Sequence, residues 1–265
     1  MSTGNAINLF LAGIPYYDGA GNFSVVTGTA GMILTSTGTS TAPTFQTNPG
    51  NGAIVTINVQ TFTSSGTYTP TTGMSYCIIE GVGGGGPGVG VSGIGGQVQT
   101  GSGGGAACYV RSLFTAASIG SSQNIIIGSA GLGNSGVGVP GTATTVGSIF
   151  SAGGGPVGTS FGAITNTYYP STIGSNIGSA TGIGTIIIPG GSAAGQVTLA
   201  QFVSASPSGT GGNSYFGAGG AGTIAGNNNA VGYGAGGSGG ANNGGGATAG
   251  GQGGPGFVII TEFIT

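Results

Sequence analysis

Residues 76–90 read YCIIEGVGGGGPGVG, an apolar stretch that passes directly into nearly pure glycine. Tyrosine, cysteine and β-branched isoleucine favour a buried β-strand. The same junction recurs in GSGGGAACYVRSLF (residues 101–114) and SIFSAGGGPVG (148–158). It runs in reverse in GGQGGPGFVIITEF (250–263), where glycine leads into the strand. Because the strands and the glycine alternate within one stretch of chain, the sequence predicts that the glycine is an ordered part of the fold.

The longest glycine-rich stretch, residues 209–256, has 22 glycines in 48 positions. Each ordered glycine costs roughly 0.5–1 kcal/mol relative to alanine, so some interaction must offset the loss. Glycine can form the left-handed polyproline-II type of helix, and such helices pack backbone against backbone where no Cβ intervenes. The alternative is a flexible linker. Apolar residues spaced through GNSYFGAGGAGTIAGNNNAVGYGAGG (residues 212–237) favour packed polyglycine-II helices.

Charge is almost absent from this chain of 265 residues: charged residues make up 2% of it and hydrophobic residues 37%. The charged side chains are Asp18, Glu80, Arg111 and Glu262, and there is no histidine. One cation cannot form the basic patch that nucleic acid requires. The four side chains form no recognisable catalytic or metal-binding motif. We therefore expect a non-enzymatic protein with no catalytic residue, no metal site, no cofactor and no nucleic-acid partner.

The apolar runs are too short to span a membrane as a helix, which needs about 20 residues. The N-terminus lacks the basic start of a secretory signal, so we expect synthesis in a cytoplasm and release by lysis or within a particle. Cys77 and Cys108 are the only cysteines. They are interpreted as buried thiols or as one disulfide, and the sequence leaves both open.

The residue pattern changes near residue 57, which predicts two domains. Residues 1–57 alternate short β-prone runs with Gly, Ser and Thr, and carry too few large side chains for a core of their own. We expect this β module to serve oligomerisation or attachment. Residues 58–265 form the predicted glycine-rich domain. The fold class predicted is all-β, with β-sandwich or jelly-roll-like strands, packed polyglycine-II helices and long glycine-rich loops. Strands are expected near residues 55–63, 66–69, 75–82, 106–114, 123–128, 142–150 and 256–264.

From Val59 to Thr265 the motifs follow a recognisable order. They are VQTFTSSGTYTP, CIIEGVGGGGPG, GGGAACYVRSLFTAASIGSSQNIIIGSAG, GTATTVGSIFSAGGG and GGPGFVIITEF. This set resembles the glycine-rich C-terminal domain of bacteriophage tail-fibre and receptor-binding (adhesin tip) proteins. The N-terminal GTAGMILTSTGTSTAPTFQT is similar to short β modules of phage fibres, which are often trimeric. The resemblance implies layered polyglycine helices whose variable loops contact host surface molecules.

Two functions follow as expectations. The first is a virion-associated tail-fibre or appendage subunit that acts in adhesion to a host-surface molecule. The second is a self-assembling subunit of an extracellular homopolymeric filament. Both predict a homo-oligomer, either a trimer or a filament, located in the virion or an extracellular appendage. A net charge of −2 gives weak self-repulsion, which permits either.

Six residues are candidates for sites. Tyr, Gly, Ser and Asn make adaptable binding surfaces, which makes Tyr168, Tyr169, Tyr215 and Phe216 receptor-binding candidates. The same aromatic rings could instead fill gaps between glycine helices. Glu80 and Arg111 each lie three residues after a cysteine, on the face opposite to it. If their strands pair, they form a structural ion pair, for which Glu262 is a competing partner; otherwise each is solvated.

Overall fold

The structure is a computed structural model. It describes residues 14–17, 23–26, 29, 32–35, 43–47, 54, 56–92, 98–159, 171–172, 178–193, 197–198 and 206–265. Contacts divide the chain into two compact units, one of residues 1–55 with Thr265 and one of residues 56–264. The described parts are strands in several antiparallel sheets with almost no helix, so the all-β prediction is confirmed.

The described residues of the first unit form two antiparallel hairpins. One pairs β1 (Ile14–Tyr17) with β2 (Phe23–Val26), and the other pairs β3 (Met32–Thr35) with β4 (Thr44–Thr47). Ile33 and Leu34 are 42% and 39% exposed. No side chain that is described in this unit is buried. The apolar side chains described here therefore lack a core within the unit.

Two five-stranded sheets form the base of the second unit. We call the first the clasp sheet; its order is β15 (Ile186–Ile188), β9 (Tyr109–Thr115), β7 (Met74–Val82), β20 (Phe257–Ile264) and β5 (Thr56–Phe62). The second has the order β14 (Gly182–Ile183), β12 (Phe150–Ala152), β11 (Thr144–Val146), β10 (Gln123–Ile126) and β6 (Gly66–Tyr68). Strand β20, the last in the chain, lies between β7 and β5 and so joins the end of the unit to its beginning.

The hydrophobic core lies between these two sheets. Alternation along β7 buries Cys77 and Ile79 and turns Ile78 and Glu80 outward. Buried members from both sheets meet in one cluster, among them Tyr68, Ile79, Ile125, Phe150, Val258 and Ile260. The core therefore fixes which face of the clasp sheet points outward.

The predicted strands match β5, β6, β7, β9, β10 and β20 in place. The single strand expected at 142–150 is wrong, because β11 and β12 are separate strands of one hairpin. Gly147 has a φ of 50° in the connecting turn, a conformation that interrupts a strand. The short helix α1 (Ala116–Ile119), begun by the Thr115 side chain, was not predicted.

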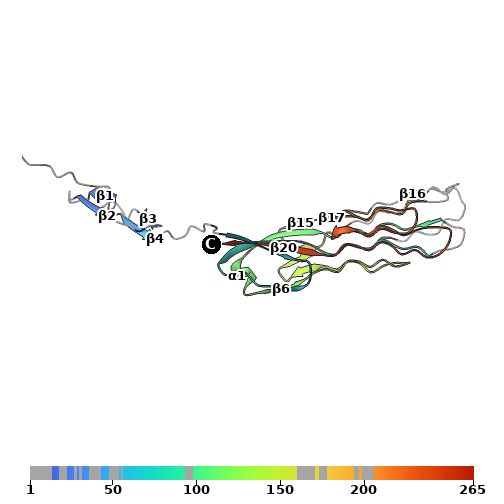
Figure 1. Cartoon of the computed structure of the whole chain (residues 1–265), viewed down its shortest axis with the longest axis horizontal. Helices are drawn as coiled ribbons and strands as arrows, with labels where there is room; N and C mark the ends of the chain where they lie inside the picture. Colours follow the sequence, from blue (N-terminus) through green and yellow to red (C-terminus); the bar gives the residue numbers. More distant parts are fainter. Residues whose placement is uncertain are drawn as a thin grey trace, which may run out of the picture. The chain divides into compact units, whose positions relative to one another are not determined.

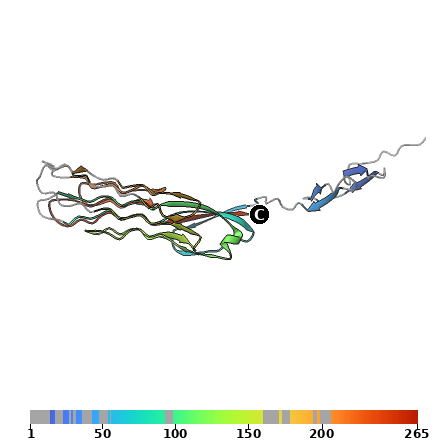
Figure 2. The same cartoon turned by 180° about the vertical axis from the view of Figure 1, so that it is seen from behind.

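Six further strands form small two-stranded sheets among the glycine segments. They are β8 (Val98–Thr100) with β19 (Ala241–Asn243), β13 (Ser171–Thr172) with β16 (Val197–Thr198), and β17 (Phe216–Ala218) with β18 (Val231–Tyr233). Within this unit the glycine segments continue from the sheet strands and run side by side away from the sheets (Figures 1 and 2).

Hydrogen bonds between the glycine segments repeat every three residues. In the segment 84–91, donors three residues apart reach the same neighbouring segment, and consecutive donors reach different ones. The N–H groups of Gly85, Gly88 and Val91 donate to the carbonyl groups of one neighbouring segment, those of Gly254, Gly251 and Thr248. Those of Gly86 and Val89 donate to the carbonyl groups of a second segment, at Gly105 and Ser102. Those of Gly84 and Gly90 donate to a third, at Thr142 and Gly136. The segment 84–91 is thus tied to neighbours in three directions.

Glycine is required at these contacts because the backbones touch. A Cβ added at Gly84, Gly85 or Gly86 would lie 1.9, 1.9 or 1.8 Å from a backbone oxygen of a neighbouring segment. Real Cβ atoms do not approach this closely, so any side chain would push the segments apart. Glycine here removes the steric barrier to packing, which accounts for the sequence pattern.

Candidate functional site

Glu80 and Arg111 lie directly opposite each other on neighbouring strands of the clasp sheet. Glu80 on β7 is the register partner of Arg111 on β9, and both side chains point to the outer face. Arg111 Nε lies 3.6 Å from Glu80 Oε1. The side chain of Glu80 is 26% exposed and that of Arg111 is 43% exposed, so the two form a partly solvated surface ion pair of modest strength.

Tyr109 joins this pair to the aromatic candidates. It lies two residues before Arg111 on β9, and its hydroxyl donates a hydrogen bond to Glu80 Oε1. Burial, followed by the hydrogen bond to Glu80 and the charge of Glu80, raises the pKa of Tyr109. The tyrosine is therefore a neutral donor across the ordinary pH range.

Tyr215 stacks on Tyr109, with ring centroids 4.1 Å apart and an interplanar angle of 23°. Phe216 lies 5.9 Å from the Tyr109 ring and packs edge-on against Phe257 at 5.3 Å. Tyr215 is 62% exposed and keeps a free surface, whereas Phe216 is partly buried. Of the two, only Tyr215 can present most of its ring to a ligand.

The structure thus gathers Glu80, Arg111, Tyr215 and Phe216 around Tyr109. The remaining candidates, Tyr168 and Tyr169, lie outside the described residues. Tyr233 stacks on Phe257, with ring centroids 4.6 Å apart. Tyr233 is part of β18, and β18 together with its partner strand β17 holds the aromatic cluster over one end of the clasp sheet's outer face.

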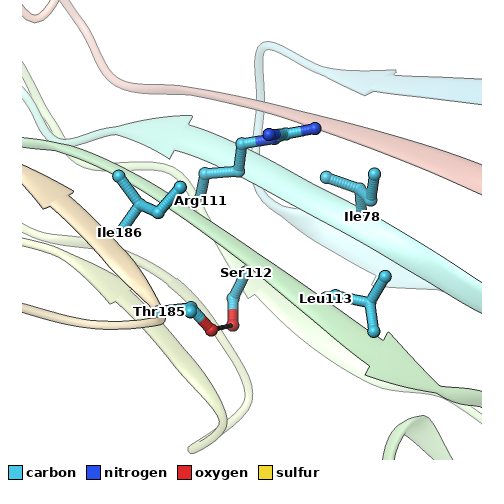
Figure 3. Close-up of a pocket in the computed structure, with 6 residues that line it drawn as sticks. All are labelled: Ile78, Arg111, Ser112, Leu113, Thr185 and Ile186. Carbon is cyan, nitrogen blue, oxygen red and sulfur yellow. Dashed lines mark hydrogen bonds between the residues drawn. The ribbon is translucent and has the colours of Figure 1, made fainter.

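A small hollow of about 200 Å³ borders the ion pair. Figure 3 shows Arg111 and Ile186 on one side and Ile78 and Leu113 on the other. The hydroxyls of Ser112 and Thr185 bond each other at 2.8 Å along its edge. Its lining is mostly apolar, and it is smaller than the roughly 300–1,000 Å³ of ordinary ligand pockets.

Glu262 does not compete for Arg111, because it is fully buried on the other face of the clasp sheet. Its Oε1 accepts hydrogen bonds from Tyr68 Oη at 2.8 Å and Thr71 N at 2.9 Å. Its Oε2 accepts from Thr71 Oγ1 at 2.6 Å and Asn58 Nδ2 at 2.8 Å. Burial by itself raises the pKa of Glu262, but these hydrogen bonds outweigh it and hold the pKa below its ordinary value. Both oxygens are saturated with protein donors, so this carboxylate is structural.

Cys77 and Cys108 are free buried thiols. Burial raises the pKa of Cys77 to about 11 and also raises that of Cys108. Within the described ranges, no three His, Cys, Asp or Glu side chains gather as a metal site would require. No helix in that same part of the chain is long and apolar enough to cross a membrane.

Sequence reasoning missed Tyr109 and the hollow beside Arg111. The signal for Tyr109 was available, since residues two apart on a strand share a face and Tyr109 precedes Arg111 by two. The contact with Tyr215 carried no such signal, because it depends on where the β17–β18 hairpin lies. Comparison with known protein families and with curated proteins finds no match for this chain.

Proposed function

We propose that this protein is a non-enzymatic, virion-associated structural subunit of a tail fibre or appendage that acts in adhesion to the host surface. The observation that carries the proposal is the bonding of the glycine segments in three directions. A body tied together by its own backbone supports the described turns between its segments, such as residues 135–137 and 244–246, in fixed positions. A binding surface built on such turns is preorganised, which lowers the entropy cost of contact with a receptor.

The finer architecture belongs to the same proposal. The three-residue repeat of the hydrogen bonds is the repeat of a polyproline-II helix, which has three residues per turn. We therefore assign the glycine segments as packed polyglycine-II helices that extend from a β-sandwich of the two five-stranded sheets. The motif order resembling phage receptor-binding domains supports the same arrangement.

The near absence of charge fits work outside a cell. Stability that rests on backbone contacts and apolar packing changes little with salt or with pH near neutrality. The receptor would then be recognised by neutral groups, through aromatic rings and amides. Tyr215 is the described residue best placed for this role, since 62% of its surface is free.

The test uses the full chain carrying a fluorescent label and a panel of bacterial strains, read by flow cytometry. We expect saturable binding to a subset of strains that unlabelled protein displaces. Tyr215→Ala should weaken binding, and Ile224→Ala, which removes another side chain 55% exposed in the glycine-rich part, is the matched control. Antibodies against the chain should also decorate virus particles that carry its gene. If the chain binds no subset of strains, and the antibodies do not decorate the virus particles, the proposal is overturned.

The filament remains the second candidate because the clasp sheet exposes apolar side chains such as Ile57 and Leu113, each 58% exposed. A heterologous contact repeated from copy to copy builds an open fibre. Negative-stain electron microscopy of the purified protein separates the two functions. Long filaments of constant width would favour the second, and discrete particles the first.

A further inference from the structure

The outer face of the clasp sheet has an apolar pattern that differs from that of a solvated sheet. An antiparallel sheet with one wet face alternates apolar residues inward and polar residues outward. Here the outward positions include Ile57, Val59, Ile78, Leu113, Ile186 and Ile259. Tyr76 and Phe263 stack on the same face at 4.6 Å. Apart from three outward threonines (Thr61, Thr115 and Thr261) and the Glu80–Arg111 pair, this is the pattern of a sheet covered on both faces.

The side chains on this face are well exposed in the single chain. Ile57, Val59 and Leu113 are 58%, 57% and 58% exposed, and Ile186 is 45% exposed. At one end of the face, Tyr109 and Phe257 are already covered by the aromatic residues of β17 and β18. The remaining rows have no cover among the described residues of this chain.

The extent of the open face suits a protein contact. Four strands about 4.8 Å apart and some seven residues long at about 3.3 Å each cover roughly 450 Å² of sheet. Side chains standing out from the sheet make the accessible area larger. Two such faces together approach the roughly 1,200 Å² at which specific interfaces begin.

Charge on this face is self-complementary. Glu80 and Arg111 are the only charged side chains of residues 56–264 apart from the buried Glu262. They sit side by side, and Arg111 Nε, though itself buried, has no hydrogen-bond partner in the described part of the chain. A two-fold axis near the pair would set the Arg111 of one copy against the Glu80 of the other. The remaining guanidinium donors would then gain a second carboxylate.

We infer that this face binds a second copy of the same chain in an isologous, two-fold contact. Two clasp sheets pack face to face about 10 Å apart, as aligned sheets do, and bury the rows through Val59 and Leu113. The hollow beside Arg111 is of a size to receive one side chain from the facing sheet. This contact does not depend on the proposed adhesion, and a protein that binds no host cell could still form it.

The test is the mass of the full chain in solution, measured by sedimentation equilibrium over a range of concentrations. We expect wild type to sediment as an even multiple of the 24.7 kDa chain. Val59→Lys should halve that mass, because the contact would have to bury the charge of the lysine and would no longer form. Val139→Lys is the matched control, since Val139 is 58% exposed but lies away from this face. The control should keep the wild-type mass.

A charge-pairing experiment identifies the geometry. Arg111→Glu and Glu80→Lys each place two like charges on the face, so each variant alone should have half the wild-type mass. An equimolar mixture of the two should recover the full mass, because opposite charges then meet across the contact. A change confined to one chain cannot produce this recovery.

Four results would overturn the inference. One is a wild-type monomer at the highest concentration, which would leave the face to another protein or to residues 1–55 of the same chain. The second is an oligomer whose mass Val59→Lys leaves unchanged, which would place the contact elsewhere. The third is an odd-numbered wild-type oligomer, and the fourth is a mixture of the two charge variants that fails to recover the mass.

Discussion

The Tyr68 hydroxyl donates a 2.8 Å hydrogen bond to Oε1 of Glu262, and both side chains are fully buried. Glu262 is on the last strand of the chain, whereas Tyr68, Asn58 and Thr71, its other donors, lie near the start of the second unit. The carboxylate therefore fastens the two ends of that unit together.

Glu262→Gln should destabilise the protein by about 3 kcal/mol. The amide nitrogen is a donor and would face donors that it cannot satisfy, so buried polar groups would lose their partners. Glu80→Gln makes the same chemical change at a partly exposed position and should cost less than about 1 kcal/mol. Urea unfolding followed by circular dichroism measures both. Equal losses at the two positions would show that the buried network contributes no special stability.

Stability should fall at acid pH through Glu262. Its pKa is lowered in the folded state, so the unfolded chain takes up the proton first. The stabilisation is complete above the unfolded value of about 4.3 and is lost as pH falls through the folded pKa. Thermal midpoints should therefore be flat from about pH 5 and drop below about pH 4. In Glu262→Gln, most of the fall in thermal midpoint below about pH 4 should disappear. If the fall is unchanged in that variant, other carboxyl groups cause it.

A separate decline is expected at alkaline pH. The pKa of Cys77 is raised from 9.0 to about 11 by burial, so above pH 9 the unfolded chain releases its proton before the folded one does. Stability is full below that value and decreases as pH rises towards 11. Cys77→Ala should reduce the slope between pH 9 and pH 11 when midpoints are compared with wild type. A slope that survives the change would point to the tyrosines.

Gly237→Ala should destabilise the glycine-rich body by at least about 1–3 kcal/mol. The added Cβ would lie 2.1 Å from the backbone oxygen of Gly251, so the segments must separate. Gly245→Ala is the matched control because a Cβ there meets nothing within 4 Å. The control should be neutral within about 1 kcal/mol. Unfolding in urea measures both, and equal tolerance at the two positions would contradict ordered backbone packing.

Trypsin should leave the folded protein intact. Arg111 is the only side chain at which it can cut, and it lies within β9, paired to Glu80 on one side and Ile186 on the other. Cleavage needs local unfolding of a strand in mid-sheet. Gel electrophoresis over hours should show an intact native chain and, in urea, two fragments. Rapid cutting of the native chain would mean that β9 opens readily.

Strand positions could be predicted because local sequence decides them. β7 and β20 are apolar, β-branched runs bounded by glycine, and they folded where expected. The split at Gly147 was missed because one positive-φ residue overrides the propensity of its neighbours. The shared outer face of Glu80 and Arg111 could be inferred from their equal spacing after two cysteines, but their direct opposition depends on the register of β7 and β9, in which Cys77 lies opposite Phe114. The saturation of Glu262 depends on Asn58 and Thr71, whose approach no local pattern encodes.

The hydrogen bonds of the segment 84–91 repeat every three residues, and this repeat constrains how the length of the segment can vary. Each donor is assigned to one of three neighbouring segments by its position in the count. A single inserted or deleted residue would put every later donor out of phase and aim it at the wrong neighbour. A whole triplet restores the phase. Descendants of this chain should therefore gain or lose length inside the glycine segments in steps of three, and in any number only at the turns.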